Sequence, residues 1–139
     1  MTATHIAKPL GGILGHGLDV VDIREFSILF KEPALPFLDR YFTSKELAAA
    51  GTGVDRLARL AGRFATKEAV LKALGIGWGD GVSFTDVEVL TSNAGTPTVV
   101  LHRSLANLQI ERHIESWLVS LSHAGNVAVA SVIALGCVS

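Results

Sequence analysis

The 139-residue chain has little cysteine, no excess of either charge and no long hydrophobic run. Its one cysteine, Cys137, cannot form an internal disulfide, which favours a reducing compartment such as the cytoplasm. Twelve Lys and Arg against thirteen Asp and Glu give a formal net charge of −1, so the overall charge predicts no nucleic acid partner. No segment approaches the ~18 apolar residues of a membrane helix, and the first ten residues lack the apolar core of a signal peptide. We therefore expect neither export nor a membrane span.

The composition is typical of a folded globular protein. Hydrophobic residues make up 49% of the chain and charged residues 18%, whereas a disordered chain would be far more polar. The length suits one domain, and we expect a loose leader over residues 1–12 followed by a single domain over residues 13–139. The sequence contains no internal repeat and no low-complexity segment.

A strand is predicted near the start of the chain. From Ile13 to Ile23, β-branched residues and glycines alternate with larger side chains. This period places Asp19 on the same face as Gly15 and Gly17, and we expect these glycines to leave open space beside its carboxylate. The opposite face carries Leu14, His16, Leu18 and Val20.

Two helices are predicted in the next part of the chain. Thr43 stands three residues before Glu46, the spacing of a capping box, so a short helix should follow and end near Gly51. The segment from about Asp55 to Leu74 is rich in Ala, Leu, Arg and Lys and stops at Gly75, where a left-handed cap forms easily. It should be the longest helix.

The remainder of the chain predicts two antiparallel hairpins. Turn residues over 92–95 and 124–126 each separate two β-rich segments. These segments are Val82 to Leu90, Thr96 to Leu101, Trp117 to Ser122 and Val127 to Leu135. Between the hairpins, Ser104 to Ser116 has the spacing of a helix packed on a sheet. The predicted class is therefore α+β, an antiparallel sheet packed against one long and several shorter helices.

One acidic residue of the long helix needs an explanation. A helical wheel places Glu68 in the middle of an apolar stripe and so turns it toward the interior or a cleft. The stripe consists of Leu57, Leu60, Ala61, Phe64 and Leu71. An unpaired carboxylate in such a place loses on the order of several kcal/mol of solvation. We therefore expect a cation to meet Glu68.

The residues alone leave two candidates for that cation. Lys72 follows four residues later, at the spacing of a common helix-stabilising ion pair. The alternative is a divalent cation shared with Asp19, which leaves Lys72 free to approach a phosphate. Magnesium commonly combines one or two carboxylates with phosphate oxygens of a substrate, so this arrangement suits a pyrophosphate-containing molecule.

Three blocks of the chain form a recognisable pattern. They are GHGLDVVDI (residues 15–23), AGRFATKEAVLKA (residues 61–73) and VSLSH (residues 119–123). In this order and at these separations they resemble the holo-acyl-carrier-protein synthase family of 4'-phosphopantetheinyl transferases, over about residues 15–133. The resemblance implies transfer of 4'-phosphopantetheine from coenzyme A to a serine of apo acyl carrier protein. It also implies release of adenosine 3',5'-bisphosphate and a place in fatty acid biosynthesis.

The resemblance further implies a homotrimer with coenzyme A in clefts between subunits. Matched residue by residue, Asp19 and Glu68 correspond to the Mg²⁺ ligands, and Lys72 to the lysine that contacts the phosphate and assists transfer. Glu68 and a metal-bound water both stay open as acceptors of the serine proton.

The same comparison implies a binding site for coenzyme A. Arg63 and His123 match positions that line this site, and the loop from Asn93 to Pro97 resembles the segment beside the adenine. By residue type alone, a histidine before a turn is more often structural, so the role of His123 depends on the resemblance. His16 stands where the family has an apolar residue, and we assign it no role.

An acidic carrier requires a local basic patch on this nearly neutral protein. The candidates are Arg24, Arg40, Lys45, Arg56 and Arg59, which equally fit a solvated charged face. The family's docking arginine has Glu25 at its place here, with Arg24 one residue earlier, and a role for Asp22 near the metal stays open. Two rival functions stay open: a magnesium-dependent nucleotide or phosphate ester hydrolase that uses Asp19, Glu68 and Lys72, and a non-catalytic trimeric module that only binds a nucleotide.

Overall fold

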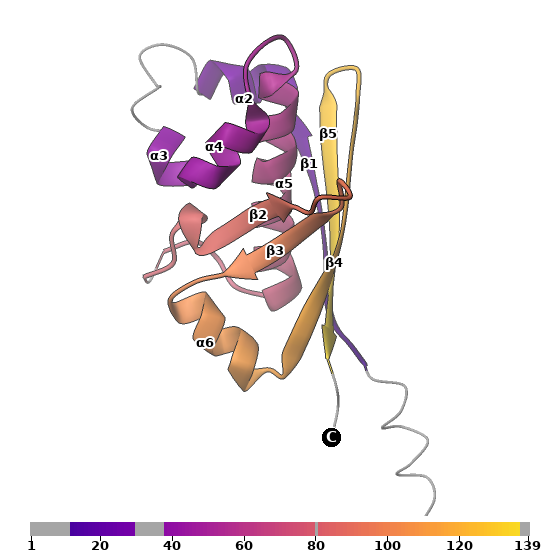
Figure 1. Ribbon diagram of the computed structural model, residues 1–139. Helices are drawn as coiled ribbons and strands as arrows, with labels where there is room; N and C mark the ends of the chain where they lie inside the picture. Colours follow the sequence, from indigo (N-terminus) through magenta and orange to yellow (C-terminus); the bar gives the residue numbers. More distant parts are fainter. Residues whose placement is uncertain (1–11, 30–37, 80, 137–139) are drawn as a thin grey trace, which may run out of the picture.

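A computed structural model of the protein describes residues 12–29, 38–79 and 81–136 (Figure 1). The elements in chain order are β1 (Gly12–Asp22), α2 (Ile23–Leu29), α3 (Leu38–Tyr41), α4 (Ser44–Ala50), α5 (Arg56–Leu74), the 3-10 turn η2 (Phe84–Asp86), β2 (Val87–Thr91), β3 (Pro97–Leu101), α6 (Ser104–Glu111), β4 (Ile114–Ala124) and β5 (Val127–Gly136). The predicted leader lies outside the described residues except for Gly12, which begins β1, and Cys137 also lies outside them.

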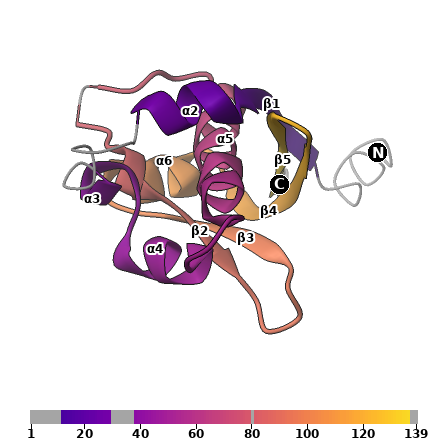
Figure 2. The same ribbon diagram turned by 90° about the horizontal axis from the view of Figure 1, so that it is seen from above.

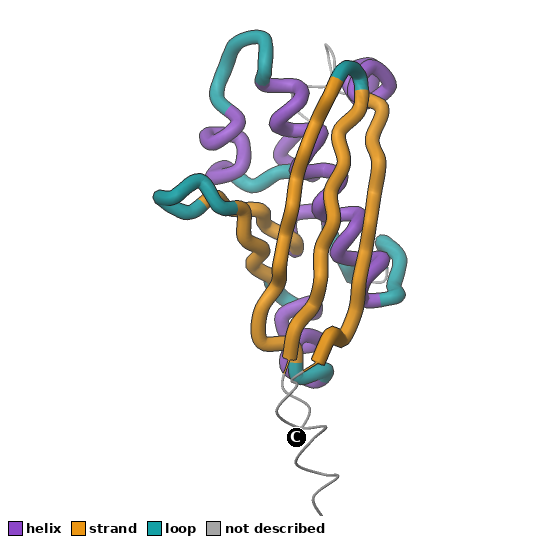
Figure 3. Tube along the Cα trace, turned by 90° about the vertical axis from the view of Figure 1, so that its right-hand side faces the viewer, coloured by secondary structure: helices purple, strands orange, loops and turns teal. Residues whose placement is uncertain are grey.

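The strands form two antiparallel sheets, which agrees with the predicted α+β class. In the larger sheet β5 lies between β1 and β4, while β2 and β3 form a separate hairpin. Helix α5 packs on one face of the larger sheet, and the described elements leave its other face uncovered (Figure 3). Seen from above, α2 and α4 lie on different sides of α5 (Figure 2). None of the described helices combines the length and the apolar character needed to cross a bilayer.

Glycines let β1 lie directly against the backbone of α5. A β-carbon at Gly17 would overlap the carbonyl oxygen of Ala69 and lie 2.7 Å from its carbonyl carbon, and one at Gly15 would overlap the carbonyl oxygen of Ala73. The expectation that these glycines leave open space beside Asp19 is therefore wrong. Helix backbone fills the space, and the close contact fixes Asp19 relative to α5.

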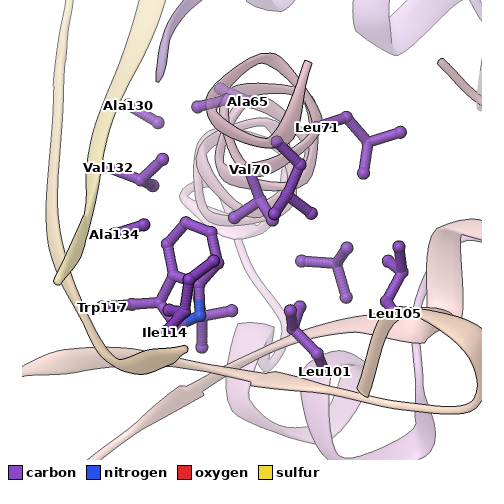
Figure 4. Packing of buried hydrophobic residues seen from close by; sticks show 14 residues of the cluster. Ala65, Val70, Leu71, Leu101, Leu105, Ile114, Trp117, Ala130, Val132 and Ala134 are labelled. Carbon is purple, nitrogen blue, oxygen red and sulfur yellow. The ribbon is translucent and has the colours of Figure 1, made fainter. Parts of the chain in front are cut away.

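The main core lies between α5, the larger sheet and the β2–β3 hairpin (Figure 4). Both layers contribute small residues to it, Ala65 and Ala69 from α5 and Ala130 and Ala134 from β5. Larger side chains complete the cluster, among them Trp117, which lies beside Ile114 (Figure 4). A second cluster around Phe26, Phe42, Leu60 and Ala128 joins α2 and α4 to the first half of α5.

Several predicted helix ends are confirmed. Helix α4 begins after a capping box in which Thr43 accepts from the backbone of Glu46 and Glu46 accepts from the backbone of Thr43. Helix α5 ends at Gly75, whose φ of 71° and ψ of 28° make it a left-handed cap. Both signals act within a few residues, which is why the sequence predicts them well.

Other boundaries differ from the prediction. Strand β2 begins only at Val87 because η2 precedes it, and the helix expected to reach Ser116 ends at Glu111, before β4 begins at Ile114. Leu57, expected on the buried stripe of α5, is 40% exposed. Burial on α5 therefore does not follow the single predicted stripe, because several layers surround the helix.

Helix α2 was not predicted, although a signal for it exists. Asp22 caps the helix by accepting from the backbone nitrogen of Glu25 at 2.9 Å, and it also accepts from Asn126 Nδ2 at 2.7 Å. Asp22 precedes Glu25 at the spacing that identified α4. These hydrogen bonds lower the pKa of Asp22, the one from Glu25 most strongly, and give this residue a structural role.

Candidate functional site

The close packing of β1 on α5 brings two of the predicted site residues to one pocket. Asp19 comes from the middle of β1 and Glu68 from α5, and both line a pocket of about 310 Å³. Asp22 and Glu25 add two further carboxyl groups, and the remaining lining comes from Val20, Val21, Phe26, Leu29 and Phe64. The pocket is therefore acidic, which suits a cation.

Lys72 binds Asp19 and not Glu68. Its Nζ donates to Asp19 Oδ1 at 2.9 Å and to the Leu18 carbonyl oxygen at 3.0 Å. The side chain of Lys72 is 55% exposed whereas that of Asp19 is 15% exposed, so the lysine reaches in from solvent. Among the described residues no ion pair joins Lys72 to Glu68, and the alternative of an i,i+4 pair is therefore wrong.

Glu68 has a different partner, which the sequence did not indicate. Its Oε1 accepts a hydrogen bond from Trp78 Nε1 at 3.1 Å, and its Oε2 has no hydrogen bond within the described part of the chain. Burial raises the pKa of the Glu68 carboxyl; Trp78 opposes this rise, Asp19 adds to it and Lys72 opposes it. Glu68 is thus a half-buried carboxylate. One of its oxygens accepts from the Trp78 indole, and the other is available to bind a cation.

The donor set matches one kind of metal site. No group of three or more His, Cys, Asp or Glu residues that could hold a metal occurs in the described ranges. Two carboxylates beside a lysine fit Mg²⁺, which takes few protein ligands and completes its coordination with water and phosphate oxygens.

Arg63 is the centre of a second region, on α5 but away from the acidic pocket. It is buried, yet its Nε has no hydrogen-bond partner among the described residues, and its other contacts, to the Arg59 carbonyl and to Thr91 Oγ1, are both long at 3.4 Å. Burial lowers the pKa of this guanidinium, and the charge of Glu46 opposes that shift. A buried, weakly bonded cation of this kind suits an anionic ligand.

The structure places two other predicted binding residues beside Arg63. His123 and Arg63 line one pocket, and Pro97 and Arg63 line a neighbouring pocket of about 300 Å³. Asn93 lies at the exposed turn between β2 and β3 and does not line either pocket. In one chain, the residues predicted for metal and phosphate therefore stand apart from those predicted for coenzyme A.

Two further features near the site were missed by sequence reasoning. Lys67 forms a fully buried ion pair with Glu46 at 2.9 Å. Lys67 is the residue directly before Glu68 in the chain. Trp78 lies in the glycine-rich segment after α5, where no periodicity indicates the direction of a side chain. The only available signal was a large aromatic residue among glycines.

The predicted basic patch divides into two groups. Arg56 and Arg59 donate to the carbonyl oxygens of Gly51 and Ala50 and so close the end of α4. Arg24, Arg40 and Lys45 are exposed on α2, α3 and α4, and of these helices α2 contributes to the wall of the acidic pocket. These three are the better candidates for contact with an acidic partner.

Comparison with known proteins identifies the family of the chain. Residues 15–131 match the family model described as 4'-phosphopantetheinyl transferase superfamily. The chain is 38% identical over 121 residues to a holo-[acyl-carrier-protein] synthase from Geobacter sulfurreducens, covering 87% of this chain and 96% of that protein.

Solved structures give the same result. The holo-[acyl-carrier-protein] synthase of Neisseria meningitidis superposes with a TM-score of 0.79 at 30% identity, covering 88% of this chain and 98% of that chain. The synthase of Helicobacter pylori, solved in complex with coenzyme A, superposes with a TM-score of 0.75 at 30% identity, covering 86% and 98%. The chain belongs to the 4'-phosphopantetheinyl transferase superfamily, as its three sequence blocks predicted.

Proposed function

We propose that this protein is a holo-[acyl-carrier-protein] synthase. It transfers 4'-phosphopantetheine from coenzyme A to a serine of apo acyl carrier protein in a Mg²⁺-dependent reaction that leaves adenosine 3',5'-bisphosphate. The observation that carries this proposal is that Asp19 from β1 and Glu68 from α5 line one acidic pocket, while Lys72 forms an ion pair with Asp19. Membership of the transferase family and the relatives' names supply the reaction.

The chain's own residues account for much of the chemistry. Asp19 and Glu68 would hold Mg²⁺, which when bound neutralises phosphate charge. Lys72 has an exposed side chain and a carboxylate partner, so its ammonium group can move to a phosphate oxygen and neutralise charge on the departing bisphosphate. The pocket walls keep the reacting groups in one place, which is the main contribution a protein makes to phosphoryl transfer.

A homotrimer with sites between subunits is part of the proposal. Asp19 and Arg63 line separate pockets in one chain, and an assembly in which one subunit's Arg63 region meets its partner's acidic pocket would join them. The uncovered sheet face carries exposed Leu18, Val20 and Leu118, an apolar surface suited to contact between subunits. The mass in solution, measured by light scattering, tests this assembly.

An acceptor assay tests the proposed reaction. The protein is incubated with coenzyme A, Mg²⁺ and apo acyl carrier protein, and the carrier is weighed by mass spectrometry. We expect the mass of one phosphopantetheine to appear on the carrier and to be absent when the metal is chelated. A cleaved coenzyme A without a carrier adduct would indicate a hydrolase, and intact coenzyme A with an unchanged carrier would indicate a binding module. Because the reaction needs coenzyme A and its carrier, we place the protein in the cytoplasm and in fatty acid biosynthesis.

A further inference from the structure

The aromatic side chain that follows α5 is directed at the reaction site. Trp78 is half-buried, and its indole N–H donates to Glu68 Oε1 at 3.1 Å. This is the one hydrogen bond of the Glu68 side chain within the described residues. An indole only donates, so it orients one carboxylate oxygen without competing for a cation at the other.

Trp78 is itself held by stacked rings. Its ring stacks on Phe84 with centroids 3.9 Å apart and planes 24° apart. Phe84 stacks in turn on Phe64, at 5.5 Å and 15°. Phe64 lies one turn before Glu68 on α5. The contacts from Phe64 through Phe84 and Trp78 to Glu68 therefore begin and end on the same helix.

The segment that carries Phe84 is fixed from its other side. Arg103 binds both oxygens of Asp86 at 2.7 Å, and it also donates to the carbonyl oxygen of Gly81 at 3.0 Å. Arg103 therefore holds the residues before and after Phe84, while Phe84 itself packs on Phe64 of α5. Ring packing and these hydrogen bonds together direct the indole toward Glu68.

We propose that Trp78 is a positioning residue that sets the orientation of the Glu68 carboxylate for Mg²⁺. The proposal rests on the proposed function for the identity of the metal. Ligating carboxylates are commonly held by a second hydrogen-bonding group, and loss of such a group typically weakens metal affinity by about 10- to 100-fold. Trp78 supplies that group from outside the helix that carries the ligand.

The matched variants are Trp78→Phe and Trp117→Phe. The first keeps a ring to stack on Phe84 and removes only the N–H. The second removes the indole N–H that donates to Gln109 Oε1 at 2.9 Å and has no hydrogen bond to Glu68. Calorimetric titration with Mg²⁺ in the presence of coenzyme A measures metal affinity without turnover. We expect Trp78→Phe to weaken it by about 10-fold and Trp117→Phe to leave it unchanged. Equal affinities in wild type and Trp78→Phe, or equal losses in both variants, would overturn the proposal.

A second measurement does not require Trp78→Phe to fold. The chain has two tryptophans, so Trp117→Phe leaves one indole N–H signal in a ¹⁵N NMR spectrum. We expect this signal to move when Glu68 is changed to Gln and when Mg²⁺ with coenzyme A is added. A signal that responds to neither contradicts the proposal. Wild-type protein that binds no Mg²⁺, with a signal that still responds to Glu68→Gln, would refute the proposed metal while the link between Trp78 and Glu68 stands.

Discussion

Lys72 forms its ion pair with Asp19, 53 residues away in the chain, and not with Glu68, one turn back on its own helix. The pairing is possible because Gly17 and Gly15 let β1 lie against the backbone of α5. As a result Glu68 keeps no cationic partner among the described residues and remains available for a metal. The same contact places Lys72 beside the acidic pocket, through its ion pair with Asp19.

Glu68→Gln is expected to lower turnover by about 100-fold or more, because an amide is a poor ligand for Mg²⁺ and cannot accept a proton. The rate of phosphopantetheine transfer to the carrier measures the effect. Glu115→Gln, an exposed glutamate on β4, is the control and should retain activity. Full activity in Glu68→Gln would show that the reaction does not depend on the Glu68 carboxylate.

Gly17→Ala is expected to lower the free energy of unfolding by about 3 kcal/mol or more, because the added methyl group overlaps the backbone of α5. Urea unfolding measures the change. Gly62→Ala is the matched control, since no neighbour lies within 4 Å of its β-carbon. Alanine favours a helix interior over glycine by about 0.5–1 kcal/mol, so this control should be neutral or stabilised. Equal stabilities of the two variants would contradict the role of Gly17 in close packing.

Lys67→Met is expected to cost about 3–5 kcal/mol of stability, because it leaves the buried Glu46 carboxylate without its cation. Lys67 also donates to the carbonyl oxygens of Phe84 and Val87, so α5 loses a link to the segment before β2. Burial lowers the pKa of this ammonium, an effect that the nearby Glu46 charge opposes.

The double variant Glu46→Gln with Lys67→Met serves as the control for this pair. Removal of both charges should recover part of the lost stability, because no unpaired charge then remains in the core. The amide that replaces the Glu46 carboxylate retains an oxygen able to accept from the backbone of Val89, as Glu46 does at 3.0 Å. A single variant as stable as wild type would show that the pair contributes nothing.

Arg24→Glu combined with Arg40→Glu is expected to raise the KM for the carrier by about 10-fold, because charge reversal opposes association with an acidic partner. Both residues are exposed, on α2 and α3. The KM for coenzyme A, measured with the same preparations, is the internal control and should not change. The effect should shrink at high salt, where surface charges are screened. Unchanged kinetics with the carrier would remove the docking surface from the proposal.

Local sequence signals predicted much of the secondary structure. The capping box of Thr43 and Glu46 and the glycine that ends α5 are confirmed, since each depends on residues within four positions. The capping signal of α2 is of the same kind but was not used. The start of β2 could not be predicted in this way, because η2 is held by the hydrogen bonds of Asp86 to Ser83 and to Arg103.

The sequence by itself determined the class of the fold, the family and the face of the chain on which Asp19 and Glu68 stand. These properties follow from periodicity and from motifs of a few adjacent residues. Only the tertiary structure decided that Lys72 pairs with Asp19, that Trp78 donates a hydrogen bond to Glu68 and that Arg63 with His123 lies apart from the acidic pocket. Such contacts join residues far apart in the chain, and their geometry depends on how closely the helix and the sheet can approach each other.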